Sequence, residues 1–258
     1  MLTDSHCHLT DERIVPFAEE IISSMADDGL ENLITVGYDK ESSLGGLAVA
    51  ESHDRVYCTL GVHPHDADKA DEATYDLFRT LARTREKVVG IGEIGLDYYY
   101  DLSPREVQKK VFAEQLQLAY ECCLPVCLHV RDAYGEALEV LKENERFLSY
   151  GVLLHCYSGS AEMVKEFLRF DAYFAFGGAI TFKNARRNLE ALAAVPRDRL
   201  LLETDCPYMT PVPFRGQVNF PKYVAIVRDK VAATLGTSAE EIELITTKNT
   251  KRLFKRMK

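Results

Sequence analysis

Short apolar segments alternate with longer amphipathic segments along almost the whole chain. In the longer segments apolar residues recur at three- and four-residue spacing, as at Ile14, Phe17 and Ile21, and this spacing predicts helices. The short segments are apolar throughout and rich in β-branched residues, which predicts buried strands. The eight predicted strands are residues 1–5, 33–37, 56–61, 88–93, 125–130, 151–155, 172–176 and 200–205. Two further helices are expected near residues 221–235 and 239–256.

The alternation of these elements predicts the fold class. Strands that are apolar on both faces and separated by helices form parallel sheets that the helices cover. Eight such units in 258 residues favour a closed barrel over an open sheet. We therefore expect an α/β fold, a single (β/α)8 TIM barrel that spans residues 1–258 as one domain. No internal repeat or interdomain linker interrupts the pattern.

Composition narrows the classes of function. The formal net charge of −9 argues against a broad basic surface that coats a nucleic-acid duplex, so any nucleic-acid substrate must be held locally. The seven cysteines contain no CxxC spacing, and no secretory leader precedes them. No apolar run reaches the roughly 20 residues of a membrane-spanning helix. We expect reduced thiols, a cytoplasmic location, no membrane association and no obligate protein partner.

Six side chains that bind metals well stand at the ends of predicted strands. His6 and His8 are two residues apart, so strand alternation directs both imidazoles to the same side. Any one of the six could instead cap a helix or hydrogen-bond within the core. In a barrel, however, the C-terminal ends of all strands meet at one mouth, where active sites lie. The residues expected at this mouth are His6, His8, Glu93, His129, His155 and Asp205.

The number of these ligands predicts how many ions they hold. One catalytic ion usually keeps three protein ligands and a water, so six ligands favour two divalent ions. Glu93 is the natural bridge, because a carboxylate has two oxygens. Imidazole and carboxylate ligands suit Mg²⁺, Mn²⁺ or Zn²⁺ without choosing sharply among them.

The motifs around these residues resemble a known family, the TatD-type metal-dependent deoxyribonucleases of the amidohydrolase-like barrel superfamily. The resemblance covers nearly the whole chain. Its motifs are Asp-Ser-His-Cys-His-Leu at 4–9, Gly-Val-His-Pro-His at 61–65, Gly-Glu-Ile-Gly-Leu-Asp-Tyr at 92–98, His-Val-Arg-Asp-Ala at 129–133, His-Cys-Tyr-Ser-Gly at 155–159 and Glu-Thr-Asp-Cys-Pro-Tyr at 203–208.

The resemblance also implies a division of the ligands. By similarity, His6, His8 and Asp205 hold one ion, His129 and His155 hold the other, and Glu93 bridges them. The chain departs from the family after the eighth predicted strand, where relatives commonly read Arg-Gly-Lys-Arg-Asn-Glu-Pro. Here residues 215–221 read Arg-Gly-Gln-Val-Asn-Phe-Pro, without the two basic residues that follow the glycine. This loss of positive charge at the mouth argues for weaker attraction to a polynucleotide.

A metal-assisted hydrolysis needs few protein groups beyond the ligands. We expect a metal-activated water to attack a phosphodiester, with Glu93 and Asp205 as the catalytic carboxylates. Asp205 is predicted both to bind metal and to accept the proton of the water. Glu203 and Asp4 lie two residues before Asp205 and His6, on the same strand faces, and are predicted to orient the metal ligands, with a buried ion pair as the alternative for Glu203.

Other polar residues near predicted strand ends are candidates for substrate binding. His63 is expected to contact a phosphate or leaving group. Arg131 and Arg215 are candidate phosphate contacts, because a guanidinium fork matches phosphate oxygens, with loop salt bridges as the alternative. Ser158 and Asp97 are candidates for substrate contact, although turn formation explains them nearly as well.

The substrate is predicted from the resemblance rather than from the residues. The leading expectation is a 3′–5′ exonuclease that acts on single-stranded DNA or other nucleic-acid ends. The aromatic run at 98–100 suits either base stacking or packing of a core or lid. The main alternative is a metal-dependent ester or amide hydrolase, such as an aminoacyl-tRNA deacylase.

Overall fold

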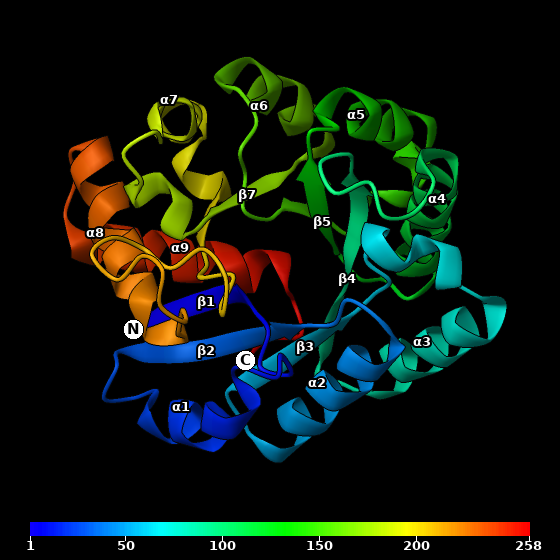
Figure 1. The fold of residues 1–258 in the computed structure, drawn as a ribbon, viewed down its shortest axis with the longest axis horizontal. Coiled ribbons are helices and arrows are strands. Elements are labelled where there is room, and N and C mark those ends of the chain that lie inside the picture. The colour runs from blue at the N-terminus through cyan, green and yellow to red at the C-terminus, as the bar shows by residue number, and fades with distance from the viewer.

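Eight parallel strands follow one another in chain order around a barrel (Figure 1). A computed structural model describes residues 1–258. The strands are β1 (Leu2–Cys7), β2 (Leu30–Val36), β3 (Val56–Leu60), β4 (Val88–Asp97), β5 (Val126–Arg131), β6 (Val152–Leu154), β7 (Tyr173–Phe176) and β8 (Leu200–Leu202). The predicted (β/α)8 barrel is confirmed.

Backbone hydrogen bonds between the first and last strand segments close the barrel. Cys7 and Cys206 form a parallel bridge beyond the end of β8. On one side of this bridge, the amide of Asp205 donates to the carbonyl of His6 at 2.9 Å. On the other side, the amide of His8 donates to the carbonyl of Cys206 at 2.8 Å. The closure therefore brings the first and last metal-binding motifs of the sequence together.

Helices surround the strand ring on its outside, except α9 (Ala239–Leu253), which runs toward the middle of the ring in this view (Figure 1). The others are α1 (Ala18–Ser24), α2 (Lys40–Ser52), α3 (Glu72–Thr84), α4 (Arg105–Glu121), α5 (Tyr134–Glu143), α6 (Ala161–Phe167), α7 (Arg186–Ala194) and α8 (Val224–Leu235). Side-chain caps fix several starts: Asp71 accepts from the amide of Thr74 at α3, and Ser238 accepts from that of Glu241 at α9. None of these helices has the length and apolar character to cross a membrane.

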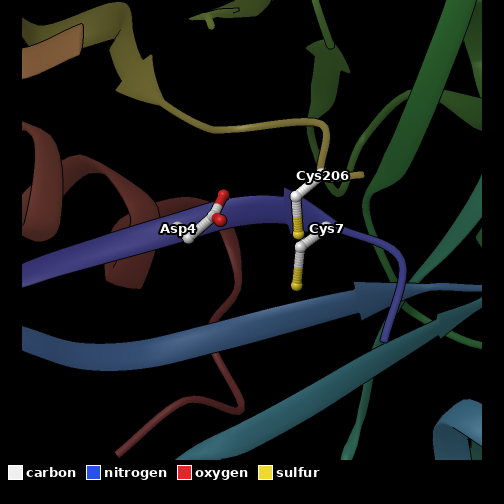
Figure 2. A group of neighbouring side chains, drawn as sticks. All are labelled: Asp4, Cys7 and Cys206. Atoms are coloured by element: carbon white, nitrogen blue, oxygen red, sulfur yellow. The ribbon is translucent and has the colours of Figure 1, made fainter. Parts of the chain in front are cut away.

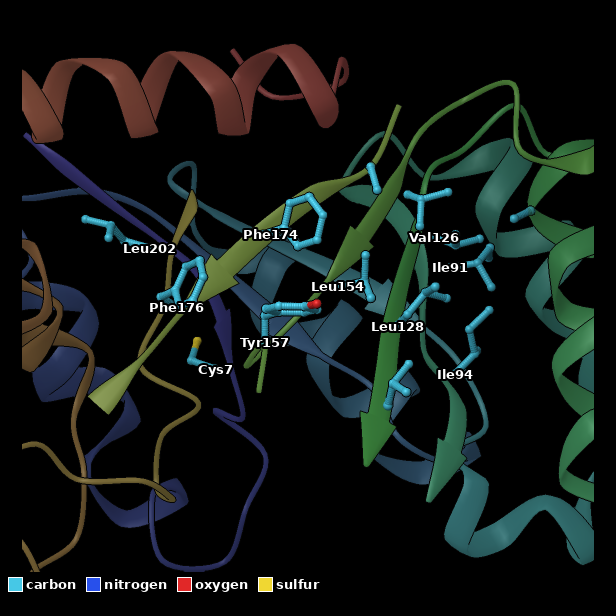
Figure 3. Packing of buried hydrophobic residues seen from close by; sticks show 14 of the residues in the cluster. Cys7, Ile91, Ile94, Val126, Leu128, Leu154, Tyr157, Phe174, Phe176 and Leu202 are labelled. Carbon is cyan, nitrogen blue, oxygen red and sulfur yellow. The ribbon is translucent and has the colours of Figure 1, made fainter. Parts of the chain in front are cut away.

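The apolar residues form two layers, because successive side chains of a strand point to opposite faces. An outer layer between strands and helices includes Val126 and Leu128 of β5 and Phe174 and Phe176 of β7 (Figure 3). A smaller inner cluster fills the barrel below the mouth. Its members are Ile34, Val36, Tyr57, Val89, Cys127, Leu153, Tyr173, Ala175, Leu201, Leu253, Phe254 and Met257. The last three come from the C-terminal end of the chain, so this end contributes to the barrel interior.

Most strand bounds differ from the prediction by a few residues, and the length differs most at β4 and β8. β4 continues past Glu93 to Asp97, so Glu93 lies inside the strand. Gly92 and Gly95 make this possible, because a Cβ atom on either would collide with β5 at Cys127 or His129. β8 is shorter than predicted and ends at Leu202. Asp205 follows in a left-handed conformation, with φ of 56°.

Candidate metal centre

Two of the predicted imidazoles meet two carboxylates near the end of β1. The Nε2 atoms of His6 and His8 lie 3.3 Å apart. Glu93 Oε2 lies 3.5 Å from the first and 3.8 Å from the second. Asp205 Oδ1 lies 3.8 Å and 3.4 Å from the same two nitrogens. Four donor atoms from β1, the residue that follows it, β4 and the segment after β8 thus converge on one point.

The other two imidazoles meet the second oxygen of the same glutamate. His129 Nδ1 and His155 Nε2 each lie 2.8 Å from Glu93 Oε1. The two nitrogens are 3.3 Å from each other. Glu93 therefore directs one oxygen to each pair of histidines.

The remaining nitrogen of each imidazole has a polar neighbour, although that of His155 lacks hydrogen-bond geometry. Nδ1 of His8 lies 3.1 Å from the carbonyl oxygen of Val36. Nε2 of His129 lies 3.0 Å from Asp97 Oδ2, and Nδ1 of His155 lies 3.5 Å from Glu203 Oε1. Nδ1 of His6 lies 3.4 Å from the thiol of Cys127, at the top of the inner cluster. Such contacts fix which nitrogen faces a metal.

The donor set fits divalent cations. Within each pair, two imidazole nitrogens point at the same place at a separation of 3.3 Å, an arrangement in which a cation satisfies both lone pairs. Glu93 is 4% exposed and stands among apolar neighbours on β4. A carboxylate so deeply buried needs cations or hydrogen bonds to offset its desolvation.

Electrostatic coupling within the group keeps the carboxylates ionised. Burial raises the pKa of Glu93, but the nearby His155 and His63 and hydrogen bonds from His129 and His155 outweigh burial and hold it well below its ordinary value. Burial also raises the pKa of Asp205, and the hydrogen bond from His8 together with the surrounding histidines lowers it further than burial raises it.

The imidazole pKa values respond to these charges. Burial lowers the pKa of His155, yet the charges of Glu93 and Glu203 raise it well above 6.5. The pKa values of His8 and His129 are raised in the same way, against burial, by hydrogen bonds to Asp205 and Asp97. The raised pKa values make protons compete with an arriving ion for these rings.

His63 lies beside the second histidine pair, as a neutral donor. Its Nε2 atom is 3.5 Å from Glu93 Oε1. Its Nδ1 atom accepts a hydrogen bond from the amide of His65 at 3.1 Å, so the ring proton resides on Nε2. Burial and the neighbouring His129 lower the pKa of His63 to about 4.

Asp97 has a role that sequence reasoning missed. It was expected to contact substrate or form a turn, and its Oδ2 atom lies 3.0 Å from His129 Nε2 and 2.9 Å from His65 Nε2. The signal for this role was present, because Glu93, Gly95 and Asp97 alternate onto one face once β4 is extended. The turn prediction also holds, since Oδ1 accepts hydrogen bonds from the amides of Tyr99 and Tyr100.

The two acids predicted to orient ligands act differently. Glu203 Oε1 accepts from the amide of Cys156 at 2.6 Å and faces the ring of His155 rather than Asp205. Asp4 touches no imidazole. Its carboxylate accepts from the amide of Thr204 at 2.9 Å, from the Thr204 hydroxyl at 2.5 Å and from the amide of His6 at 3.3 Å. It therefore fastens β1 to the segment that carries Asp205.

The surroundings of Asp4 are buried (Figure 2). Figure 2 shows its carboxylate beside the thiols of Cys7 and Cys206, on the strand segments that close the barrel. Burial raises the pKa of Asp4 to about 8, against the lowering effect of its hydrogen bonds. Cys7 and Cys206 belong to the outer apolar layer.

The three remaining substrate-binding candidates lie outside the ligand group. The guanidinium carbon of Arg131 is 3.9 Å from the ring centre of Tyr99, and that of Arg215 is 3.7 Å from the ring centre of Phe182. The hydroxyl of Ser158 is 3.1 Å from that of Tyr134. None of the three contacts the six predicted ligands.

Asn219 holds the irregular segment after β8. It is fully buried, and its amide nitrogen donates to the carbonyls of Thr204 at 2.8 Å and Tyr208 at 2.6 Å. The amide of Phe220 donates back to its side-chain oxygen at 3.0 Å. Asn219 therefore retains a structural role in the stretch where the neighbouring basic residues of the family motif are absent.

Comparison with known proteins identifies the family. A family model described as TatD related DNase matches residues 3–255. The chain is 42% identical over 255 residues to a Bacillus subtilis protein named uncharacterized metal-dependent hydrolase YabD, with 99% of each chain covered. It is 34% identical over 259 residues to a protein of Enterobacter lignolyticus named 3′-5′ ssDNA/RNA exonuclease TatD, with 97% of this chain and 98% of the relative covered.

A solved structure agrees with these matches. YJJV, a TatD homolog from Escherichia coli K12, superposes with a TM-score of 0.92 at 31% identity, and the alignment covers 98% of both chains. The similarity includes the barrel and every segment that carries a predicted ligand. The chain therefore belongs to the TatD family of metal-dependent hydrolases, within the amidohydrolase-like TIM-barrel superfamily.

Proposed function

We propose that this hydrolase is a two-metal exonuclease that releases nucleotides from the 3′ end of single-stranded DNA. The observation that carries the two-metal part is the division of the Glu93 carboxylate, with Oε2 toward His6 and His8 and Oε1 toward His129 and His155. Asp205 completes the first group. The mixed nitrogen and oxygen donors suit Mg²⁺, Mn²⁺ or Zn²⁺.

The protein residues have distinct tasks in this proposal. Bound divalent ions supply a lowered pKa for water and charge stabilisation for phosphoryl oxygens. Asp205 directs Oδ1 to the histidines, and its Oδ2 atom has no protein donor, so Oδ2 is free to accept a proton from the attacking water. Its lowered pKa keeps it ionised for this task. His63 presents a neutral Nε2–H that donates to a phosphoryl or leaving oxygen.

Support for a nucleic-acid substrate comes from the relatives and from local charge. One relative is named for 3′-5′ exonuclease activity on single-stranded DNA and RNA, and the family model is named for DNase activity. Lys183, Arg186 and Lys230 line a shallow depression of about 650 Å³ near the loop after β7. Phe182 also lines it and carries Arg215 on its ring. Arg186 pairs at 2.8 Å with Glu190 of the same depression, so Lys183 and Lys230 are its cations without an acidic partner, and they offer local rather than global attraction to phosphates.

The direct test uses single-stranded DNA labelled at its 5′ or its 3′ end, with protein reconstituted with each of the three metals. The proposal expects a ladder of shortened 5′-labelled products and early release of the 3′ label. Glu93→Gln should abolish the release, whereas Glu106→Gln, at an exposed position of α4, should leave it unchanged.

An ester or amide hydrolase is the second candidate function, favoured by the absence of the two basic residues between Gly216 and Asn219. An aminoacyl-ester substrate, tested beside the DNA with the same metal-loaded samples, separates the two. Ester cleavage without any DNA shortening would overturn the nuclease proposal in favour of this second function.

A further inference from the structure

Two tyrosines that the metal centre does not use project from the end of β4. Tyr99 is 58% exposed and Tyr100 is 54% exposed. Their neighbour Tyr98 differs, since it is only partly exposed, packs against the outer apolar layer and carries Arg105 over its ring at 4.2 Å. Of the two uses expected for this aromatic run, packing therefore applies to Tyr98 and leaves the other two rings without an apolar partner layer.

A cation with no acidic partner stands against these rings. The guanidinium carbon of Arg131 lies 3.9 Å from the ring centre of Tyr99 and 4.9 Å from that of Tyr100. No carboxylate lies within 4 Å of Arg131, although many of the other arginines are paired with one, including Arg13, Arg79 and Arg199. In a chain of net charge −9, such an unpaired guanidinium is available to an anion.

The rings and the cation are fixed relative to the metal centre through Asp97. One oxygen of Asp97 accepts from the amides of Tyr99 at 2.9 Å and Tyr100 at 2.8 Å. The other oxygen holds the ring of His129. Arg131 is two residues beyond His129 on β5 and is paired in register with Asp97. The same carboxylate therefore sets the position of a metal-facing imidazole and of the two exposed rings.

We propose that Tyr99, Tyr100 and Arg131, here called the aromatic shelf, bind one unpaired nucleobase and its neighbouring phosphate beside the scissile bond. The inference rests on the proposed nuclease function and specifies its substrate. Exposed rings stack on any base of a single strand, whereas bases inside a duplex are already stacked. Arg131 supplies hydrogen bonds to the adjacent phosphate.

Binding to the shelf can be measured without turnover. The probe is a short single-stranded DNA with 2-aminopurine at the 3′-terminal position, and Glu93→Gln serves as the non-cleaving background. Stacking quenches the probe, and the chain contains no tryptophan to interfere. The shelf predicts quenching that is lost when Tyr99→Ala and Tyr100→Ala are combined and retained when both become Phe. Tyr120→Ala, an exposed tyrosine of α4, is the matched control and should change nothing.

Kinetics with an abasic substrate test whether the rings act on the base. We expect the double alanine variant to raise KM about tenfold on normal single-stranded DNA, within the range known for base–aromatic stacking. Removing the terminal bases should raise KM for the wild-type protein by a similar factor. The variant should show no further loss on the abasic substrate, because both changes remove the same contact.

Three outcomes decide the inference. An equal loss by the variant on normal and abasic DNA would overturn it, because the rings would then act on something other than a base. An unchanged KM together with unchanged quenching would also overturn it. Absence of cleavage with every metal would refute the proposed nuclease instead, and the quenching measurement would still decide whether the shelf binds a base.

Discussion

Replacing Asp97 by Asn tests how the structure prepares His129 for metal binding. Asp97 is an obligate acceptor, and burial of its carboxylate is offset by hydrogen bonds from His129 and His65, which hold its pKa below the ordinary value. It therefore keeps the proton of His129 on Nε2, so that Nδ1 presents its lone pair beside Glu93. An asparagine can keep Oδ1 toward the amides of Tyr99 and Tyr100, but it turns an NH₂ donor toward Nε2.

This exchange favours the wrong tautomer of His129, with the proton on the nitrogen that must bind metal. The hydrogen bonds of Oδ2 with His129 and His65 are lost as well, and a charge-assisted bond of this kind is worth about 1.5–3 kcal/mol. We expect the affinity for the ion proposed at His129 and His155 to fall by about 10- to 100-fold, the range typical for residues that orient metal ligands. The other ion, at His6 and His8, should bind as before.

The assay is calorimetric titration of the metal-free protein with Mn²⁺ or Zn²⁺, supported by circular dichroism to confirm the fold. Asp101→Asn is the control, because Asp101 is exposed and pairs only with Arg105. Wild-type affinity at both sites of Asp97→Asn would refute the reasoning, and so would equal weakening of both.

Three further effects follow from the same structure. Metal affinity should fall as pH decreases, beginning above pH 6.5, because the raised pKa values of His8, His129 and His155 make protons compete with the ion. Calorimetric titrations in buffers of different ionisation enthalpy should detect the released protons. An affinity that does not depend on pH would contradict this expectation. His63→Ala should lower kcat by about 10²-fold or more with metal content unchanged, and a loss of metal would mark it as a ligand instead. Asn219→Ala should lower the free energy of unfolding by about 1–3 kcal/mol in denaturant titrations, because the carbonyls of Thr204 and Tyr208 lose their donor. Gln217→Ala, at an exposed position, is the control and should have little effect.

Much of the barrel could be predicted because its pattern is local. Most strands are runs of apolar residues, and the period of two that puts His6 and His8 on one side is a property of any strand. The convergence of the six residues follows from barrel topology, because the C-terminal ends of all strands meet at one mouth.

What could not be predicted depends on contacts between distant segments. The extension of β4 to Asp97 relies on close approach to β5, which Gly92 and Gly95 permit. Without that extension, Asp97 does not share a face with Glu93, and its contact with His129 cannot be foreseen. Asp4 is similar, because its partner Thr204 lies 200 residues away and meets it only when the barrel closes.

The division of Glu93 between two ions is the central claim, and Mn²⁺ tests it most directly. Titration of the metal-free protein should saturate at two Mn²⁺ per chain, and electron paramagnetic resonance of the loaded sample should show the exchange-coupled spectrum of two ions joined by a carboxylate. In Glu93→Gln the coupling should disappear. Saturation at one ion per chain, or two ions whose spectra are uncoupled in the wild-type protein, would contradict the account.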